Sequence, residues 1–141
     1  MTFVQSAAIR FGAAFTIAAA VLAFTPAAAN AEPGGHKVRY TITSGLDVTY
    51  SLYYLVTDPA SKAAYDANPN AYLRNERVTI APGAPWVFET NLNDTSWAYV
   101  NAGKAVGYQG APNPHCDIAI DGNVVAQQDG ESVVTCALKS W

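Results

Sequence analysis

Residue types that carry catalytic and metal-binding chemistry are scarce in this sequence of 141 residues, which holds two histidines and two cysteines. A hydrolytic triad needs a base placed against a nucleophile, and neither His36 nor His115 lies in such a pattern. The adjacent pair His115-Cys116 lacks chelating spacing, and no second cluster supplies the remaining ligands of a metal site. The sequence therefore predicts a protein that is not an enzyme and that holds no metal and no cofactor.

Charge is also sparse, because charged residues make up 13% of the chain and basic residues nowhere form a run. With a net charge of −3 and no basic patch, nucleic acid and anionic lipid surfaces are not expected as partners. The C-terminal part of the sequence contains four acidic residues within 15 positions: Asp117, Asp121, Asp129 and Glu131. They lack the spacing of a dedicated calcium loop, so we interpret them as exposed acidic turns.

Long hydrophobic runs are absent after Ala31, but one apolar stretch lies near the N terminus, from Phe11 to Phe24. Arg10 precedes it and Ala29-Asn30-Ala31 follows as a cleavage site, which is the layout of a secretory signal peptide. The stretch is about 14 residues long, whereas a membrane-spanning helix needs roughly 20. We therefore predict a signal peptide over 1–31, and a membrane as partner only if this leader is not cleaved.

Cleavage would leave residues 32–141, or 141 − 31 = 110 residues, which is the size of one domain. Export to an oxidising space would make a disulfide the simplest role for the only two cysteines, Cys116 and Cys136. The predicted location is therefore extracytoplasmic, either secreted or in the cell envelope.

Apolar and polar residues alternate with the period of a β-strand in most of the remaining chain, and β-branched and aromatic residues are frequent there. Asp121-Gly122 and Asp129-Gly130 are strong tight-turn signals, while Pro82 to Pro85 fits either a hairpin or a corner between two sheets. The expected strands are 36–43, 46–57, 76–81, 86–92, 97–103, 116–120, 124–128 and 132–138. This pattern predicts an all-β fold, a sandwich or a barrel.

The cysteines favour the sandwich. Cys116 shares a strand face with Ile118, and Cys136 shares one with Val134, so both sulfurs point into the core. In a simple meander their strands lie two positions apart, about 10 Å, which is too far for a disulfide. Either a bent sheet or a last strand that crosses to the opposing sheet would bring the cysteines together, and we expect the crossing, because a sandwich brings the inner faces of two sheets together. The predicted fold is an antiparallel immunoglobulin-like β-sandwich of seven to eight strands with one disulfide.

The expected core contains aromatic and aliphatic residues from most of these strands. Trp86 is in phase with core residues, whereas Trp97 and Trp141 are equally compatible with a buried and an exposed position. The predicted core residues are Tyr40, Val48, Tyr50, Leu52, Trp86, Phe88, Ile118, Ile120, Val134 and Leu138.

The longest segment without alternation, from Asp58 to Asn75, is the candidate contact surface. It includes a short helix expected near 61–68 and gathers Tyr65, Tyr72 and Arg74, residue types that are enriched at interface hot spots. Loops on a rigid sandwich often carry binding residues, so these three are the predicted partner-binding residues. The competing interpretation is that both tyrosines cover an open end of the core.

The strand and cysteine pattern resembles the periplasmic part of the mycobacterial membrane protein small family, MmpS. The segments that carry the resemblance are "VRYTIT", "LDVTYSLYY", "APGAPWVFETNL", "CDIAIDGNVVAQQ" and the late "VVTC". The resemblance implies a small immunoglobulin-like sandwich with one disulfide and an accessory role beside resistance-nodulation-division exporters of the MmpL type. That family usually keeps an N-terminal transmembrane helix, whereas this chain has a cleavage site, so the fold carries over better than the function.

We therefore expect a secreted or envelope-associated accessory protein that binds a protein partner, such as an envelope protein or an exporter. The alternative is a secreted binding module for a glycan, a lipid or a small ligand.

Overall fold

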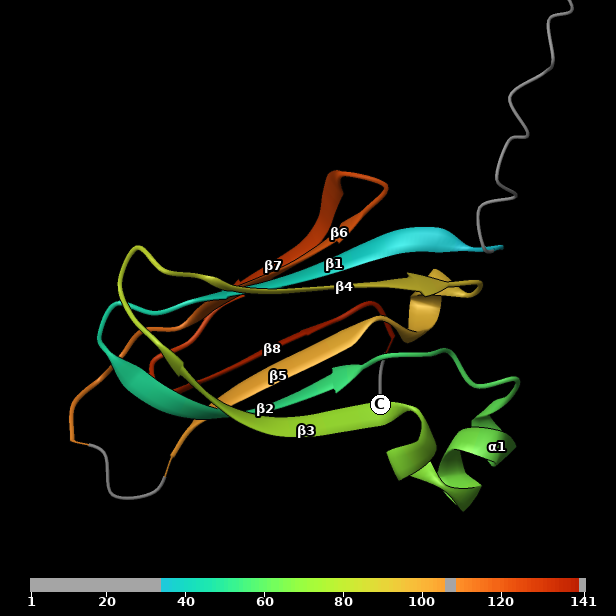
Figure 1. The fold of residues 1–141 in the computed structure, drawn as a ribbon, viewed down its shortest axis with the longest axis horizontal. Helices are drawn as coiled ribbons and strands as arrows, with labels where there is room; N and C mark the ends of the chain where they lie inside the picture. Colours follow the sequence, from blue (N-terminus) through green and yellow to red (C-terminus); the bar gives the residue numbers. More distant parts are fainter. Residues whose placement is uncertain (1–33, 106–108, 140–141) are drawn as a thin grey trace, which may run out of the picture.

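The computed structural model describes residues 34–105 and 109–139, which form two four-stranded antiparallel sheets packed face to face (Figure 1). Sheet A has the strand order β4-β1-β6-β7 and sheet B the order β3-β2-β5-β8. The elements are β1 (His36–Thr43), β2 (Val48–Leu55), α1 (Lys62–Ala67), the 3₁₀-helix η1 (Pro69–Ala71), β3 (Leu73–Ile80), β4 (Trp86–Leu92), the 3₁₀-helix η2 (Thr95–Trp97), β5 (Tyr99–Lys104), β6 (His115–Ile120), β7 (Asn123–Asp129) and β8 (Val133–Ala137). The predicted antiparallel sandwich of seven to eight strands is confirmed.

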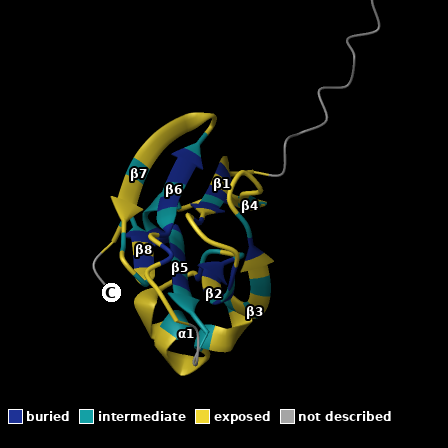
Figure 2. Ribbon diagram, turned by 90° about the vertical axis from the view of Figure 1, so that its left-hand side faces the viewer, coloured by how far each residue is buried: buried dark blue, intermediate teal, exposed yellow. Residues whose placement is uncertain are grey.

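Alternation along the central strands builds the core between the sheets. Val38, Tyr40 and Ile42 of β1 are fully buried, while their neighbours point to the outer face of sheet A. The same period places residues of β2, β5 and β6 in the core, as the dark colour of these strands shows in Figure 2. Of the ten residues predicted inside, six are buried: Tyr40, Val48, Tyr50, Leu52, Ile118 and Val134.

The other four predicted core residues, Trp86, Phe88, Ile120 and Leu138, are only partly buried and pack against the core from its margin. The prediction overestimated the burial of these four residues, because they lie at the margins of the sheets. Trp86 and Phe88 lie on β4, an edge strand, which has a neighbouring strand on one side only. Ile120 ends β6 and Leu138 follows the last strand.

Two turns position these strands. The segment Pro82 to Pro85 is a corner between the sheets, because β3 pairs with β2 in sheet B and β4 pairs with β1 in sheet A. The β6–β7 hairpin turns at Asp121 and Gly122, whose φ angles of 50° and 87° are the left-handed values that a tight Asp-Gly turn requires.

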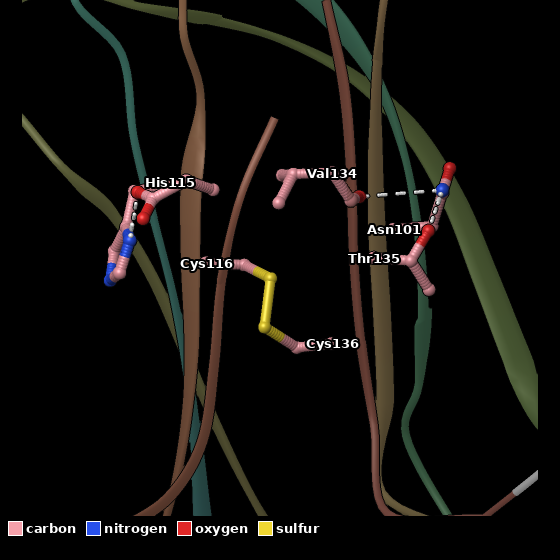
Figure 3. The surroundings of a disulfide bond; sticks show 7 residues. Asn101, His115, Cys116, Val134, Thr135 and Cys136 are labelled. Atoms are coloured by element: carbon pink, nitrogen blue, oxygen red, sulfur yellow. Dashed lines mark hydrogen bonds and ion pairs between the residues drawn. A yellow bond between two sulfur atoms is a disulfide. The ribbon is translucent and has the colours of Figure 1, made fainter. Parts of the chain in front are cut away.

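A disulfide joins the two sheets, with Cys116 on β6 of sheet A and Cys136 on β8 of sheet B (Figure 3). The Cα atoms are 6.1 Å apart and both residues are buried. The pairing and the crossing of the last strand to the opposing sheet are both confirmed. A disulfide is compatible with an extracytoplasmic location.

Within residues 34–105 and 109–139, no helix is long and apolar enough to cross a membrane. The predicted leader and Trp141 lie outside the described residues.

Candidate functional site

A helical segment between β2 and β3 stands out from the sandwich and forms one end of the molecule (Figure 1). Ser61 caps α1, since its side chain accepts a hydrogen bond from Ala64 N at 3.1 Å. The segment returns to the sheet where Val56 N donates to Tyr72 O at 2.8 Å. Neither α1 nor η1 contains a fully buried residue, and most of their side chains face solvent, whereas Tyr65 packs against the core from outside.

Tyr65 and Tyr72 meet on this segment, as the sequence predicted, with ring centroids 6.3 Å apart. Tyr65 also packs against the buried Trp97 of η2 at 5.6 Å, and the ammonium of Lys139 lies 3.9 Å from the Trp97 ring centroid. Both tyrosines are partly buried, and burial, followed by the nearby Asp66, raises the pKa of Tyr65. We call Tyr65, Tyr72, Trp97 and Lys139 the aromatic end.

Arg74 does not belong to the aromatic end. The segment predicted as a loop to Asn75 ends at Tyr72, because Leu73 already pairs with Leu55 in the ladder between β3 and β2. Strand pairing therefore fixes Arg74 at the open edge between β3 and β4, where its guanidinium lies 5.8 Å from the centroid of Phe88. Of the three predicted partner-binding residues, the structure brings only the two tyrosines together.

A second group of polar and aromatic residues, not singled out in the sequence, lies on the outer face of sheet B. The ladders place Tyr53 opposite Asn75 on one side and Asn101 on the other, and Asn101 opposite Thr135. Tyr53 is 46% exposed. We call the four residues Asn75, Tyr53, Asn101 and Thr135 the tyrosine row. The signal was present in the alternation of β2, where Tyr53 is out of phase with the buried Tyr54.

The aromatic end and the tyrosine row adjoin each other on this face. Leu55 alternates onto the same face as Tyr53 and is nevertheless fully buried, which places a covering segment over this end of the sheet. Burial raises the pKa of Tyr99, and the nearby Tyr65 and Tyr53 raise it further. Tyr99 alternates onto the same face of β5 as Asn101 and lies at the first residue of that strand.

Of the four predicted acidic turn residues, Asp121 and Asp129 contact the two histidines. Asp117 was wrongly predicted as an exposed turn residue, because it lies within β6 and is half-buried. Asp121 accepts a hydrogen bond from His36 Nδ1 at 2.6 Å, and Asp129 accepts one from His115 Nδ1 at 2.8 Å (Figure 3 shows His115). These contacts lie at the two ends of β7. In the part of the chain that the structure describes, no three histidine, cysteine or acidic residues gather as metal ligands.

Comparison with known proteins places the fold in a family. The model of the Rv2576c beta-sandwich domain matches residues 40–136, which span β1 to β8 and both cysteines. The uncharacterized proteins Rv2576c of Mycobacterium tuberculosis and Mb2606c of Mycobacterium bovis are each 40% identical over 124 residues, covering 87% of this chain and 79% of theirs. No solved structure matches. The chain therefore belongs to the Rv2576c β-sandwich family.

Proposed function

We propose that this chain is a non-enzymatic accessory protein of the cell envelope or secreted space, and that it binds a protein partner through the aromatic end. The observation that carries the proposal is the helical segment itself, whose two helices contain no fully buried residue and contact the core mainly through the half-buried Tyr65. Because this segment contributes little to the hydrophobic core, its side chains are available to contact a partner. Its tyrosines are residue types that dominate binding energy at interfaces.

Several contacts fix the helical segment on the sandwich, and a fixed surface supports binding of a partner of complementary shape. The Ser61 cap, the Val56 to Tyr72 hydrogen bond and the stacking on Trp97 hold it against the disulfide-linked sandwich. A surface that is already ordered loses little entropy on binding. The Lys62–Asp66 ion pair, at 2.6 Å, neutralises the two charges of α1. The aromatic end would therefore select its partner by ring contacts together with the positive charge of Lys139.

The resemblance to MmpS proteins extends this proposal to a partner class. An extracytoplasmic sandwich of this kind would act beside a large resistance-nodulation-division exporter of the MmpL type, and the disulfide is compatible with that location. Finding the chain in the membrane fraction would support this role. Release into the culture filtrate, with an N terminus at Glu32, would support the signal peptide and weaken the exporter role.

Site-specific photo-crosslinking tests the contact surface. A photoreactive amino acid at the exposed Asn70 of η1 is expected to capture a specific envelope protein, identified by mass spectrometry. The matched control carries the same group at Val87, which is 49% exposed on the outer face of sheet A. Equal capture from both positions would contradict the proposed surface.

The double substitution Tyr65→Ala/Tyr72→Ala separates binding from folding. We expect capture from position 70 to fall more than about tenfold, which corresponds to about 1.4 kcal/mol. The melting temperature should hardly move, and Tyr65→Phe/Tyr72→Phe should keep most of the binding. A melting temperature lower by many degrees would show that the tyrosines serve the core and that the contact lies elsewhere.

A further inference from the structure

The geometry of sheet B points to a second binding site, separate from the protein-partner surface: the tyrosine row takes an uncharged oligosaccharide strand lying across the sheet. This inference does not depend on the proposed protein partner. It rests on the arrangement, the fixed hydrogen-bonding groups and the charge of the outer face of sheet B.

The arrangement supplies one contact residue from each of the four strands. Asn75 of β3, Tyr53 of β2, Asn101 of β5 and Thr135 of β8 are consecutive ladder partners. Three strand spacings give the row a length of about 14 Å. An exposed tyrosine thus lies between groups that hydrogen-bond, in a line long enough for several sugar rings. Ligand sites commonly combine an apolar ring surface with a few fixed polar groups in this way.

The polar groups of the row are held in place by the sheet. Asn75 Nδ2 donates to Leu52 O at 3.0 Å, and Asn101 Nδ2 donates to Thr135 Oγ1 at 2.7 Å. Each amide is thereby oriented, and its carbonyl oxygen can accept a hydrogen bond from a sugar hydroxyl. Thr135 accepts through its oxygen, so its own proton can be donated to a ligand. These side chains need little reordering on binding, which lowers the entropic cost.

Charge and shape favour a neutral, extended ligand. Of the residues on β2, β3, β5 and β8 that alternate onto this face, only Arg77 is charged, and it lies on an edge strand. In the neighbouring row, the two central strands carry the small residues Ser51 and Gly103, and the edge strands carry Arg77 and Val133, which is 56% exposed. The tyrosine ring therefore borders a low surface in the middle of the sheet, flanked by two larger side chains. A hydroxyl-rich ligand without charge matches this face better than a phosphate or an acidic peptide, which would find few cations.

A second copy of the chain is the competing occupant of this face. Stable protein interfaces have a desolvated, largely apolar centre. The exposed Val133 lies on β8, an edge strand of this face. The centre of the face is a row of amides and a hydroxyl around one tyrosine, whose polar groups would need matched partners in a dimer. The composition therefore favours a solvated ligand that brings its own hydroxyl groups.

Heteronuclear NMR titration tests the inference on protein purified as the cell produces it and labelled with ¹⁵N. The probes are cellohexaose, maltohexaose and mannohexaose, each added separately. Binding of at least one hexasaccharide should shift the side-chain amide signals of Asn75 and Asn101 together with the backbone amide of Tyr53. Tyr53→Ala should weaken that binding at least about tenfold. Tyr53→Phe should retain it, because the ring surface remains.

Two further variants keep the outcome decisive. Asn101→Ala should weaken binding severalfold, and Val87→Ala on sheet A should leave it unchanged. Tyr53 is 46% exposed, so its substitution should leave the melting temperature within a few degrees. If that variant unfolds, Tyr53→Phe and Asn101→Ala still provide the comparison.

Three results would overturn the inference: no shift with any of the three hexasaccharides at millimolar concentration, shifts confined to the aromatic end, or binding that Tyr53→Ala leaves intact. A concentration-dependent dimer in light scattering that Tyr53→Ala abolishes would also overturn it, since the face would then belong to a second copy. Loss of sugar binding with unchanged crosslinking at position 70 would show that the two sites are independent.

Discussion

Tyr53 and Tyr54 are neighbours in the sequence and lie in opposite environments. Tyr54 is 1% exposed, and its hydroxyl donates to Glu76 Oε1 at 2.9 Å, whereas Tyr53 is 46% exposed on the outer face of sheet B. Burial, followed by Glu76, raises the pKa of Tyr54. The strand period assigns one tyrosine to the core and the other to solvent. Whether a tyrosine of β2 lies in the core or faces solvent therefore depends on its position in the strand alternation.

Asp121 provides a pH-dependent prediction at the scale of single residues. Its carboxylate accepts hydrogen bonds from His36 Nδ1 and from Lys37 N, and these hold its pKa below the ordinary value of 3.8. A lowered pKa contributes stability that is present above the ordinary value and is lost as the pH falls through the folded-state value. The difference in unfolding free energy between wild type and Asp121→Asn should therefore persist above about pH 4 and shrink below it.

Urea unfolding at a series of pH values measures this difference. Asp47→Asn is the control, because Asp47 is an exposed carboxylate of the β1–β2 turn. A difference that stays constant from neutral pH down to about pH 2 would contradict the assigned hydrogen bonds.

At the scale of elements, the helical segment shows what local pattern can and cannot predict. The short helix expected near 61–68 is α1, Lys62–Ala67, because Ser61 is a good cap and the following alanines favour a helix. The end of the segment was placed three residues too late, at Asn75. Leu73 and Arg74 have no alternation signal of their own, and they become strand because β2 offers them a ladder. Such pairing depends on a distant segment, which a local pattern does not contain.

The Ser61 cap gives a prediction for this segment alone. Ser61→Ala removes the side-chain acceptor of Ala64 N and should cost the helix about 1 kcal/mol. Hydrogen exchange at the Tyr65 amide, which donates to Ser61 O, should then be about fivefold faster. Because α1 buries no residue, the melting temperature of the whole domain should stay nearly constant.

Ser61→Asp is the control for the cap, since aspartate is also a good cap and should keep the wild-type exchange rate. Unchanged exchange in Ser61→Ala would mean that the stacking of Tyr65 on Trp97 alone holds the helix.

At the scale of the whole molecule, the sandwich and its disulfide were predictable and the functional surface was only partly so. Two cysteines in phase with Ile118 and Val134 favoured facing sheets over one bent sheet, and the structure confirms the facing sheets. The tyrosine row is composed of residues from four strands, so it exists only after the strand order of sheet B is known. The half-burial of Trp86 has the same cause, because alternation predicts the inner face but not which strand is the edge.

The disulfide carries the stability prediction for the whole domain. Cys116 and Cys136 are 20 residues apart, and closing a loop of that size stabilises the fold by about 3 kcal/mol in the chain-entropy model. Urea unfolding of the oxidised and the fully reduced protein should show this difference. Reduced protein retains both sulfur atoms in the core, so the comparison isolates the covalent link. Equal stabilities would contradict a closed disulfide in the native protein.

The crossing of the last strand has a consequence for proteolysis. Gly122, in the exposed turn between β6 and β7, lies inside the loop that the disulfide closes, as does the whole of β7. A protease that cuts at this turn would produce two fragments that remain covalently joined, each paired into a different sheet at its cysteine. The nicked molecule would migrate as one chain without reductant and as two fragments with it. A protease could therefore cut this protein at the β6–β7 turn without releasing either part.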